Sequence, residues 1–441
     1  MQQRICLLVF PVTSKPPNPS SPFSISQARG IIKDLFPHRQ AIYFADLLVS
    51  ITIGYLAAGE YLWGDGPLWV TVACYLIGGF ALFRVGSFIH EIVHFRGKEM
   101  RAFRITWDII AGIPMLMPSY FYLNHIDHHK IHHYGTGKDG EYLPLASGTL
   151  RNVLKFYSQV LVLPLFVFFR FALLTPISFL HPRLRQWTLE CASSYVINFR
   201  YRREVSEGSV RKWWAAQEIL CSLRAMGFAV SIAIGVNEPM FLPRLYGFAI
   251  FVLGLNYIRN LVAHHYRSDG ESMTHEDQLH DSVNITGGYV FTELFFPLGL
   301  RYHALHHLFP ALPYHNLGIA HRRLLRELSE NSAYRATVYS SFWDVVGVLW
   351  SDMRQAARGG NRSADVWFRR RREILATTED HSLIPEISWE RPDGVDVFGF
   401  GMRFLLKTGP RTYGEVLGVY NWSDDPRFRR EGIFLSHNFL F

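Results

Sequence analysis

Residues 67–94 read PLWVTVACYLIGGFALFRVGSFIHEIVH, an apolar run that ends in two histidines four positions apart. A helix of this length can cross a bilayer, whose hydrocarbon core takes about 20 apolar residues. Arg96, Lys98 and Arg101 follow the run, whereas the link before it, residues 60–66, carries no Lys or Arg. The positive-inside rule therefore places the two histidines at the cytoplasmic end of a membrane helix.

Other apolar blocks extend this pattern over residues 41–260 of the 441-residue chain, which is 49% hydrophobic. The block 41–59 forms a hairpin with the quoted run, and the blocks 219–236 and 240–258 form a second hairpin, which gives four spans. Long apolar blocks of this kind are typical of membrane spans rather than of one large soluble core.

Two further apolar stretches would place the histidine groups on opposite membrane faces if both were counted as spans. The stretch 105–123 contains Asp108 and two prolines, so we expect it to be interfacial. The stretch 156–180 has basic residues on both sides, so we expect it to be re-entrant or to lie along the surface. The predicted fold is an all-α integral membrane protein: four transmembrane helices in two hairpins, re-entrant or interfacial segments, and a cytoplasmic helical cap.

The formal charge of +8 comes without a long Lys/Arg tract or a nucleic-acid-binding motif. A nucleic-acid partner is therefore not expected. Membrane lipids with anionic headgroups, or an acidic electron-transfer partner, account for the charge better. The four cysteines are scattered and indicate neither a disulfide framework nor a CxxC metal site.

Four groups of polar residues stand at the predicted cytoplasmic helix ends. Histidines three or four positions apart share one face of a helix, so each group can direct its imidazoles at one metal centre. The candidate ligands are His90 and His94; His125, His128 and His129; His264, one turn after Asn260; and His303, His306 and His307. The histidines expected to be solvated or capping are His132, His133, His265, His275, His280, His315 and His321.

Nine candidate histidines exceed the needs of one zinc ion, which takes three or four protein ligands. Imidazole also suits iron, and two iron ions with four or five ligands each would use the whole set. Soluble di-iron enzymes use Glu-x-x-His pairs, and Glu91 is the only carboxylate of that kind in these groups, so the centre would be almost entirely nitrogen-ligated. Glu91, His132 and His133 could support the ligands from behind.

The patterns HxxxH at His90–His94, HxxHH at His125–His129 and HxxHH at His303–His307 resemble the three histidine boxes of the membrane fatty acid desaturase superfamily. Asn260 and His264 are similar to an element of animal stearoyl-CoA desaturases that supplies a further ligand and an asparagine holding an iron-bound water. The resemblance implies two iron ions, molecular oxygen as co-substrate, and a desaturase acting on a fatty acyl lipid, acyl-CoA or acyl-carrier substrate.

The resemblance also implies a domain organisation. Residues 1–40 form an N-terminal leader, residues 41–330 a desaturase-like membrane domain with the di-iron centre, and residues 331–441 a cytoplasmic C-terminal extension. The HPGG haem motif of fused cytochrome b5 domains does not occur in the sequence. Electrons are therefore expected from a separate donor of the ferredoxin or cytochrome b5 type.

Two alternative functions stay open at this point. A hydroxylase or ketolase of the same superfamily, acting on a lipid or hydrocarbon, begins with the same hydrogen abstraction as a desaturase. A membrane zinc metalloprotease is also conceivable, because HEIVH fits the HExxH pattern with Glu91 as general base. A protease of this kind needs a third ligand, and the nearest match to the usual Pro-Asp-Gly turn, Pro392–Gly394, lies in the polar tail.

Overall fold

The computed structural model describes residues 24–96, 98–205, 210–238 and 240–359, and the backbone of four strands between residues 381 and 439. Residues 1–23 of the expected leader and the Pro392–Gly394 turn lie outside the described residues. The chain forms two compact units, Met1–Ala364 and Asp365–Phe441. Each unit is described by itself below.

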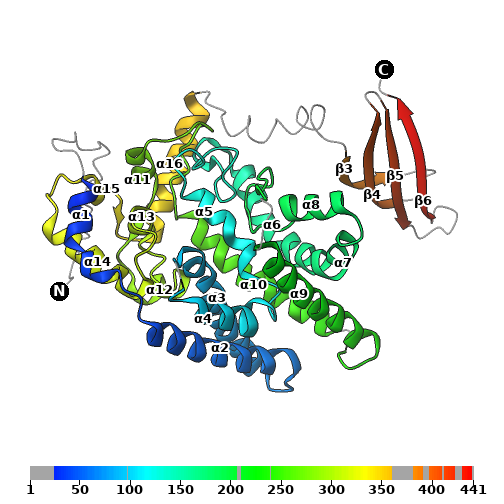
Figure 1. Ribbon diagram of the computed structural model, residues 1–441, viewed down its shortest axis with the longest axis horizontal. Helices are drawn as coiled ribbons and strands as arrows, with labels where there is room; N and C mark the ends of the chain where they lie inside the picture. Colours follow the sequence, from blue (N-terminus) through cyan, green and yellow to red (C-terminus); the bar gives the residue numbers. More distant parts are fainter. Residues whose placement is uncertain are drawn as a thin grey trace, which may run out of the picture. The chain divides into compact units, whose positions relative to one another are not determined.

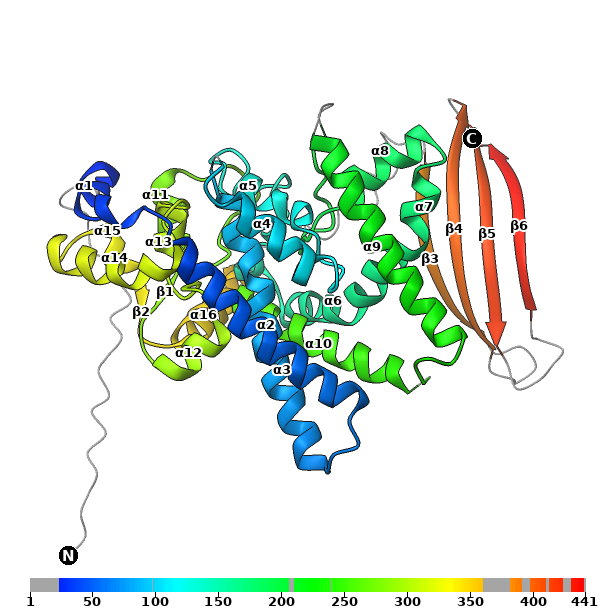
Figure 2. The same cartoon turned by 60° about the horizontal axis from the view of Figure 1, so that its bottom comes forward.

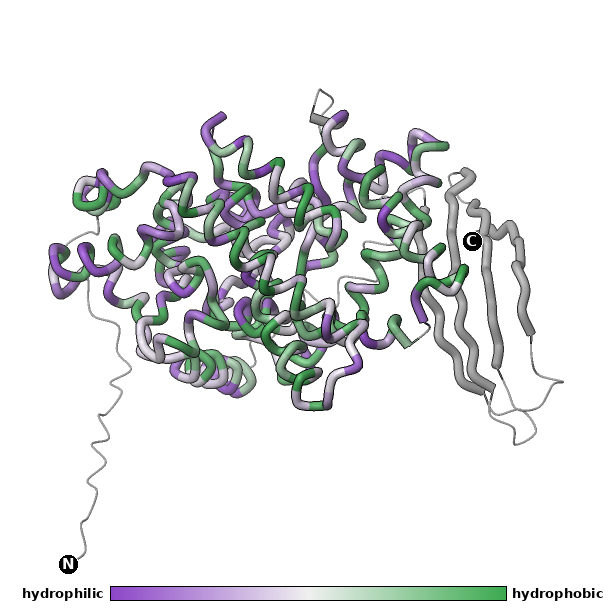
Figure 3. The backbone as a smooth tube through the Cα atoms, turned by 90° about the horizontal axis from the view of Figure 1, so that it is seen from below, coloured by the Kyte–Doolittle hydropathy of each residue, from purple (hydrophilic) through white to green (hydrophobic). Residues whose placement is uncertain are grey.

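The first unit is built on long apolar helices (Figures 1 and 2). Helix α2 (Gln40–Trp63) and helix α3 (Leu68–His94) pack against each other as an antiparallel hairpin, and α9 (Val210–Ala233) is followed by α10 (Phe241–Leu261). Figure 3 shows runs of hydrophobic residues over this unit, interrupted by hydrophilic segments. The predicted helical membrane fold is confirmed for the first unit.

A fifth described helix is also long and apolar enough to cross a membrane. Helix α6 (Leu150–Phe169) continues through a π-helical turn, Arg170–Leu174, into α7 (Thr175–Ser178). The sequence interpretation had taken this stretch as re-entrant because of its basic flanks. Arg170 is buried here, donates to Ser193 Oγ at 2.7 Å and pairs with Glu218 of α9, which compensates a charge in apolar surroundings. By length and composition, the candidate spans therefore number five rather than four.

The expected interfacial stretch 105–123 is not a long helix. It is divided into α4 (Arg101–Trp107), a π-helical turn over Asp108–Gly112 and a 3-10 helix over Ser119–Asn124. Asp108 accepts hydrogen bonds from the Ser119 backbone nitrogen and hydroxyl, both at 2.8 Å. These bonds close the loop and direct the chain toward the second histidine box.

Short elements form the cap, which we define as the non-spanning part of the first unit. They are α1 (Ile25–Ile31), a 3-10 turn (Lys33–Leu35), α5 (His125–His128), a 3-10 turn (Leu145–Ser147), α8 (Pro182–Cys191), α11 (His275–Asp281), β1 (Asn284–Ile285), α12 (Tyr289–Phe295), α13 (His303–Leu308), α14 (Tyr314–Glu327), α15 (Ala333–Ala336), β2 (Val338–Tyr339) and α16 (Phe342–Gly359). Strands β1 and β2 pair in parallel, and α16 packs on the turn at Leu145–Ser147. Residues 331–359, assigned from the sequence to the C-terminal extension, are therefore part of the first unit.

The end of the leader is also part of the cap. The sequence assigned residues 1–40 to a separate N-terminal leader, but in the described part α1 packs on α14, and Ala28, Ile32 and Leu35 are buried in the main core. The apolar spacing of these three residues explains why the segment is held: it covers a surface of the cap that water would otherwise meet.

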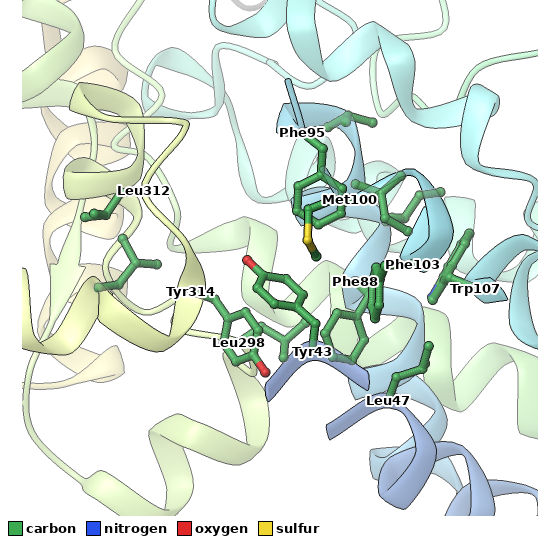
Figure 4. Packing of buried hydrophobic residues seen from close by; sticks show 14 of the residues in the cluster. Tyr43, Leu47, Phe88, Phe95, Met100, Phe103, Trp107, Leu298, Leu312 and Tyr314 are labelled. Carbon is green, nitrogen blue, oxygen red and sulfur yellow. The ribbon is translucent and has the colours of Figure 1, made fainter. Parts of the chain in front are cut away.

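The main core lies where α2, α3, α4 and α14 meet (Figure 4). The ring centroids of Tyr43 and Tyr314 are 4.9 Å apart, and the Tyr43 hydroxyl donates to Glu91 at 2.6 Å. The indole of Trp107 donates to the Val85 carbonyl at 2.8 Å. This packing fixes the C-terminal end of α3, which carries the first histidine box.

The second unit is a four-stranded antiparallel sheet in the order β3-β4-β5-β6 (Figure 1). Its strands are β3 (His381–Glu390), β4 (Val397–Gly409), β5 (Thr412–Trp422) and β6 (Arg430–Phe439). The sequence showed no simple periodicity in this tail and no strands were predicted. Glycines and charged residues interrupt the aromatic and β-branched residues there, which weakens the period of two that a half-buried strand normally shows.

Candidate metal centre

Four separate parts of the chain bring the nine candidate ligands together. His90 and His94 lie one turn apart at the end of α3. The second box forms α5 and the residue after it, the third box forms α13, and His264 follows the end of α10. Helical spacing within each box sets the neighbouring imidazoles on one side, as the sequence predicted.

The histidines gather into two groups. The first contains His90, His94, His125 and His306, and the second contains His128, His264, His303 and His307. Within each group the possible ligand atoms all lie within 4.8 Å of one another.

His129 stands beside the first group and against the second. Its Nε2 is 3.0 Å from His125 Nε2 and 3.1 Å from His306 Nε2. Its ring stacks on that of His307 with centroids 4.3 Å apart. The nine histidines can therefore be divided as five around one position and four around a second.

Hydrogen bonding in the second group shows that its nitrogens fit a cation. His128 Nδ1 lies 2.8 Å from the Asp139 carboxylate, which can only accept, so the proton of His128 is on Nδ1. Tyr134 donates its hydroxyl proton to Asp281, so the His264 Nδ1, 2.7 Å from the Tyr134 oxygen, must be the donor in that contact. Both Nε2 atoms then present lone pairs.

These two Nε2 lone pairs are 3.2 Å apart, an arrangement that is repulsive unless a cation lies between them. Two imidazole nitrogens bound to one ion at about 2.1 Å, at ordinary coordination angles, are separated by roughly 3 Å. His303 Nε2 is 3.0 Å from His264 Nε2 and 3.2 Å from His307 Nε2, which repeats the same spacing. The donor set thus has the dimensions of a metal site.

The first group contains buried nitrogens that lack partners. Both ring nitrogens of His90, which is 3% exposed, and Nε2 of His94 have no hydrogen-bond partner among the described residues. A buried imidazole left without a partner loses its hydration without compensation. A metal ion bound at these lone pairs would remove that cost.

Electrostatics favour neutral imidazoles. Burial holds the pKa of six histidines outside the spans well below the ordinary value of 6.5: His125, His129, His264, His303, His306 and His307. For His128 burial acts in the same direction, but the charge and hydrogen bond of Asp139 outweigh it and raise its pKa. Neutral imidazole is the form that binds metal, so the pocket is prepared for ligation.

Three acidic residues that orient the ligands were not identified from the sequence. Glu141 lies 2.9 Å from His125 Nδ1, Asp139 contacts His128, and Asp281 holds Tyr134 behind His264. Burial raises the pKa of Glu141 to about 7. A carboxylate behind a ligating histidine fixes its tautomer and ring orientation. The acidic pair at positions 139 and 141, soon after the second box, was the available signal.

Asn260 lines a small cavity between the two groups, together with His125, His128, His264 and His303. The cavity leaves space for about one water molecule. Arg259 and Tyr122 also line it. This position is compatible with the water-holding role that the resemblance implies for Asn260.

Glu91 belongs to neither metal group and hydrogen-bonds to neighbouring helices instead. It accepts from the Tyr43 hydroxyl and from the Tyr314 backbone nitrogen at 3.1 Å, so it ties α3 to α2 and α14. Both hydrogen bonds hold the carboxylate in a structural role, which argues against its acting as the general base of a zinc protease.

The remaining histidines stay outside both groups. His132 is exposed, and His133 lies 3.7 Å from the Asp127 carboxylate. His265 contacts the Tyr339 hydroxyl at 3.0 Å, and His321 contacts Tyr334 at 2.7 Å. None of these contacts supports a ligand directly.

Comparison with known proteins agrees with this geometry. Residues 67–339 match the family Fatty acid desaturase. A ceramide hydroxylase from Caulobacter vibrioides (strain NA1000 / CB15N) is 38% identical over 335 residues, which cover 75% of this chain and 93% of the relative. No solved structure matches the chain. The chain therefore belongs to the fatty acid desaturase family, a family of membrane oxidoreductases of lipid metabolism.

Proposed function

We propose that the nine histidines hold two iron ions, five ligands at the first group with His129 included and four at the second. Imidazole nitrogen suits iron, and the spacing of the Nε2 atoms supports two adjacent ions rather than one. When bound, such an iron pair supplies activation of molecular oxygen and removal of hydrogen from an unactivated carbon. The Nδ1 atoms of His125, His128 and His264 contact Glu141, Asp139 and Tyr134, respectively. These contacts would keep the Nε2 lone pairs directed at the iron pair.

We propose further that the reaction is hydroxylation of an acyl chain in a ceramide-like lipid. The observation that carries this proposal is the similarity to the ceramide hydroxylase, which extends over 93% of that protein. The sequence analysis had favoured desaturation. Both reactions share the first hydrogen removal, and box spacing does not distinguish them, so a relative of this similarity weighs more than the spacing.

The balanced reaction places one oxygen atom of molecular oxygen in the C–H bond and releases the other as water. It needs two electrons and two protons, and we propose that the electrons come from a separate ferredoxin or cytochrome b5 type protein at the cytoplasmic face. Burial of six of the nine histidines limits the access of bulk water to the metal groups. The water-sized cavity at Asn260 gives a place for a single ordered water.

The experiment combines metal analysis with product analysis. Purified protein reduced by a ferredoxin system is given a ceramide and heavy-isotope oxygen gas, and the lipid is analysed by mass spectrometry. The proposal expects two irons per chain and a product that gains one labelled oxygen. Loss of two hydrogens without oxygen would instead establish desaturation, the second candidate supported by the family match. A single zinc ion and no lipid product would refute both.

Matched variants separate catalysis from general damage. His128→Ala removes a buried candidate ligand and should lose the product and part of the iron. His275→Ala changes an exposed histidine at the start of α11, outside both groups, and should keep both.

A further inference from the structure

A second cavity, of about 270 Å³, lies apart from the metal groups. Its walls come from α3, α12, α14 and the link that leads into α13. Charged side chains line it: Arg84, Arg301, Arg322 and Glu293. The metal centre uses none of these four residues.

Arg301 is the buried member of this lining, with 2% of its surface exposed. Its Nε donates to the Ile285 carbonyl at 2.8 Å and its Nη2 to the Gly287 carbonyl at 3.2 Å. Nη1 is buried and has no partner among the described residues. A buried guanidinium N–H without an acceptor is costly, so the wall of the cavity lacks one hydrogen-bond acceptor.

Charge in the cavity is also unbalanced. Arg84 is held by both oxygens of Asp46, at 2.8 and 2.6 Å, and lies 3.7 Å from Glu293. Arg322 is exposed and has no ion-pair partner among the described residues. Three guanidinium groups against two carboxylates leave one positive charge uncompensated, and a ligand with a single negative charge would neutralise it.

The position of the cavity indicates where that ligand comes from. Helix α12 packs on the apolar helix α10 and exposes Val290, Phe291 and Leu294, which suits contact with a bilayer. Helix α14 on the other wall is amphipathic and basic, as expected of a helix at the membrane surface. These two walls are what is expected of a cavity that opens at the level of lipid headgroups.

We propose that this cavity binds the phosphodiester of an anionic membrane phospholipid, with the oxygens of the phosphate facing Arg301 and Arg322. Guanidinium groups bind phosphate oxygens through paired N–H donors. A phosphodiester carries the single negative charge that the lining requires. The link from Gly299 to Tyr302 forms part of the wall and runs directly into His303, so bound lipid would stabilise the approach to the third box.

Thermal unfolding of the full-length protein in detergent micelles tests this site without turnover, so its result is independent of the proposed hydroxylation. Dioleoylphosphatidylglycerol is the probe, and dioleoylglycerol and glycerol 3-phosphate are the separate halves of the molecule. A ligand that binds only the folded state raises Tm. We expect a rise with the phospholipid that neither half reproduces.

Variants assign the rise to the cavity. Arg322→Ala should lose most of the rise in Tm. It removes a positive charge from the cavity lining, and Arg322 makes no hydrogen bond or ion pair with another described residue that would be lost at the same time. Glu293→Gln should increase the rise, because it removes a negative charge from the wall. Arg326→Ala is the matched control, since Arg326 is exposed on the same helix and does not line the cavity; it should keep the full rise.

Three results would overturn the proposal. An unchanged rise in Arg322→Ala would place the lipid elsewhere. An equal rise with dioleoylglycerol would mean that the acyl chains alone are bound. An equal rise with glycerol 3-phosphate would make the ligand a free phosphate compound instead of a lipid.

Discussion

Asp139→Asn tests whether the buried carboxylates set the ligands. Asp139 is fully buried, and its carboxylate accepts from three N–H donors: His128 Nδ1 at 2.8 Å, the Gly135 nitrogen at 3.0 Å and the Glu141 nitrogen at 2.9 Å. An asparagine keeps the shape but replaces one oxygen with an NH2 group. If the NH2 group replaces Oδ1, it faces the backbone N–H of Glu141. If it replaces Oδ2, it faces the backbone N–H of Gly135, and His128 must move its proton to Nε2, where a metal would have to bind.

The magnitude follows from these two outcomes. An unsatisfied buried donor costs about 1–3 kcal/mol. Loss of a carboxylate behind a ligating histidine lowers metal affinity or activity about ten- to a hundredfold. Since tenfold corresponds to about 1.4 kcal/mol, the two estimates agree. We therefore expect Asp139→Asn to weaken iron binding by this factor.

Titration of the metal-stripped protein with ferrous iron under anaerobic conditions measures the effect. Glu276→Gln is the matched control, because it makes the same chemical change on an exposed helix, α11, away from the ligands. Unfolding of the stripped variants separates lost stability from lost affinity. Iron affinity in Asp139→Asn equal to that of the unchanged protein would refute the orienting role.

Three further predictions concern the same centre. His306→Ala should lose iron and product, as should the alanine variant of each of the other eight candidate ligands, whereas His280→Ala, at a partly exposed histidine outside both groups, should keep both in the same metal and lipid assays. Asn260→Ala should keep its fold and lose most turnover if it holds the water; near-normal turnover with the free energy of unfolding lowered by about 1 kcal/mol would instead assign it a purely structural role. The stripped protein should lose stability as pH falls through the ordinary histidine pKa of 6.5, because His125 and its five buried neighbours stay neutral when folded but take up protons when unfolded, and a flat Tm from pH 7 to about pH 5 would contradict this.

The gathering of the candidate ligands could be predicted because their residue types repeat at helical spacing next to apolar runs. His125 and His129 are four positions apart and therefore lie on one face of a helix, and His303 and His307 repeat this spacing. The distant orienting group Asp281 could not be found in the same way. Asp281 acts on His264 through Tyr134, a residue 147 positions away from it in the sequence. Only the fold brings such partners together, so spacing carries no trace of them.

Membrane crossings were harder to count than ligands for a related reason. The basic flanks of 156–180 argued against a span by the positive-inside rule, and an arginine inside the stretch, Arg170, is costly in lipid without a partner. The structure answers this at Arg170, which is paired with Glu218 and hydrogen-bonded to Ser193. Compensation by a residue 48 positions away is invisible to a rule that weighs each apolar stretch by itself.

Glu91 shows most clearly why geometry must decide between functions that share a motif. As a sequence motif, HEIVH matches the HExxH pattern of zinc proteases, in which a glutamate directly follows the first histidine. On a helix, adjacent positions point about 100° apart, so Glu91 cannot share the face that His90 and His94 present to the metal. A general base could still reach a substrate beside the ion from there, but Glu91 is held by Tyr43 and Tyr314 on the far side of α3. The same five residues therefore supply two candidate ligands to the proposed all-histidine centre and one carboxylate that anchors the helix carrying them.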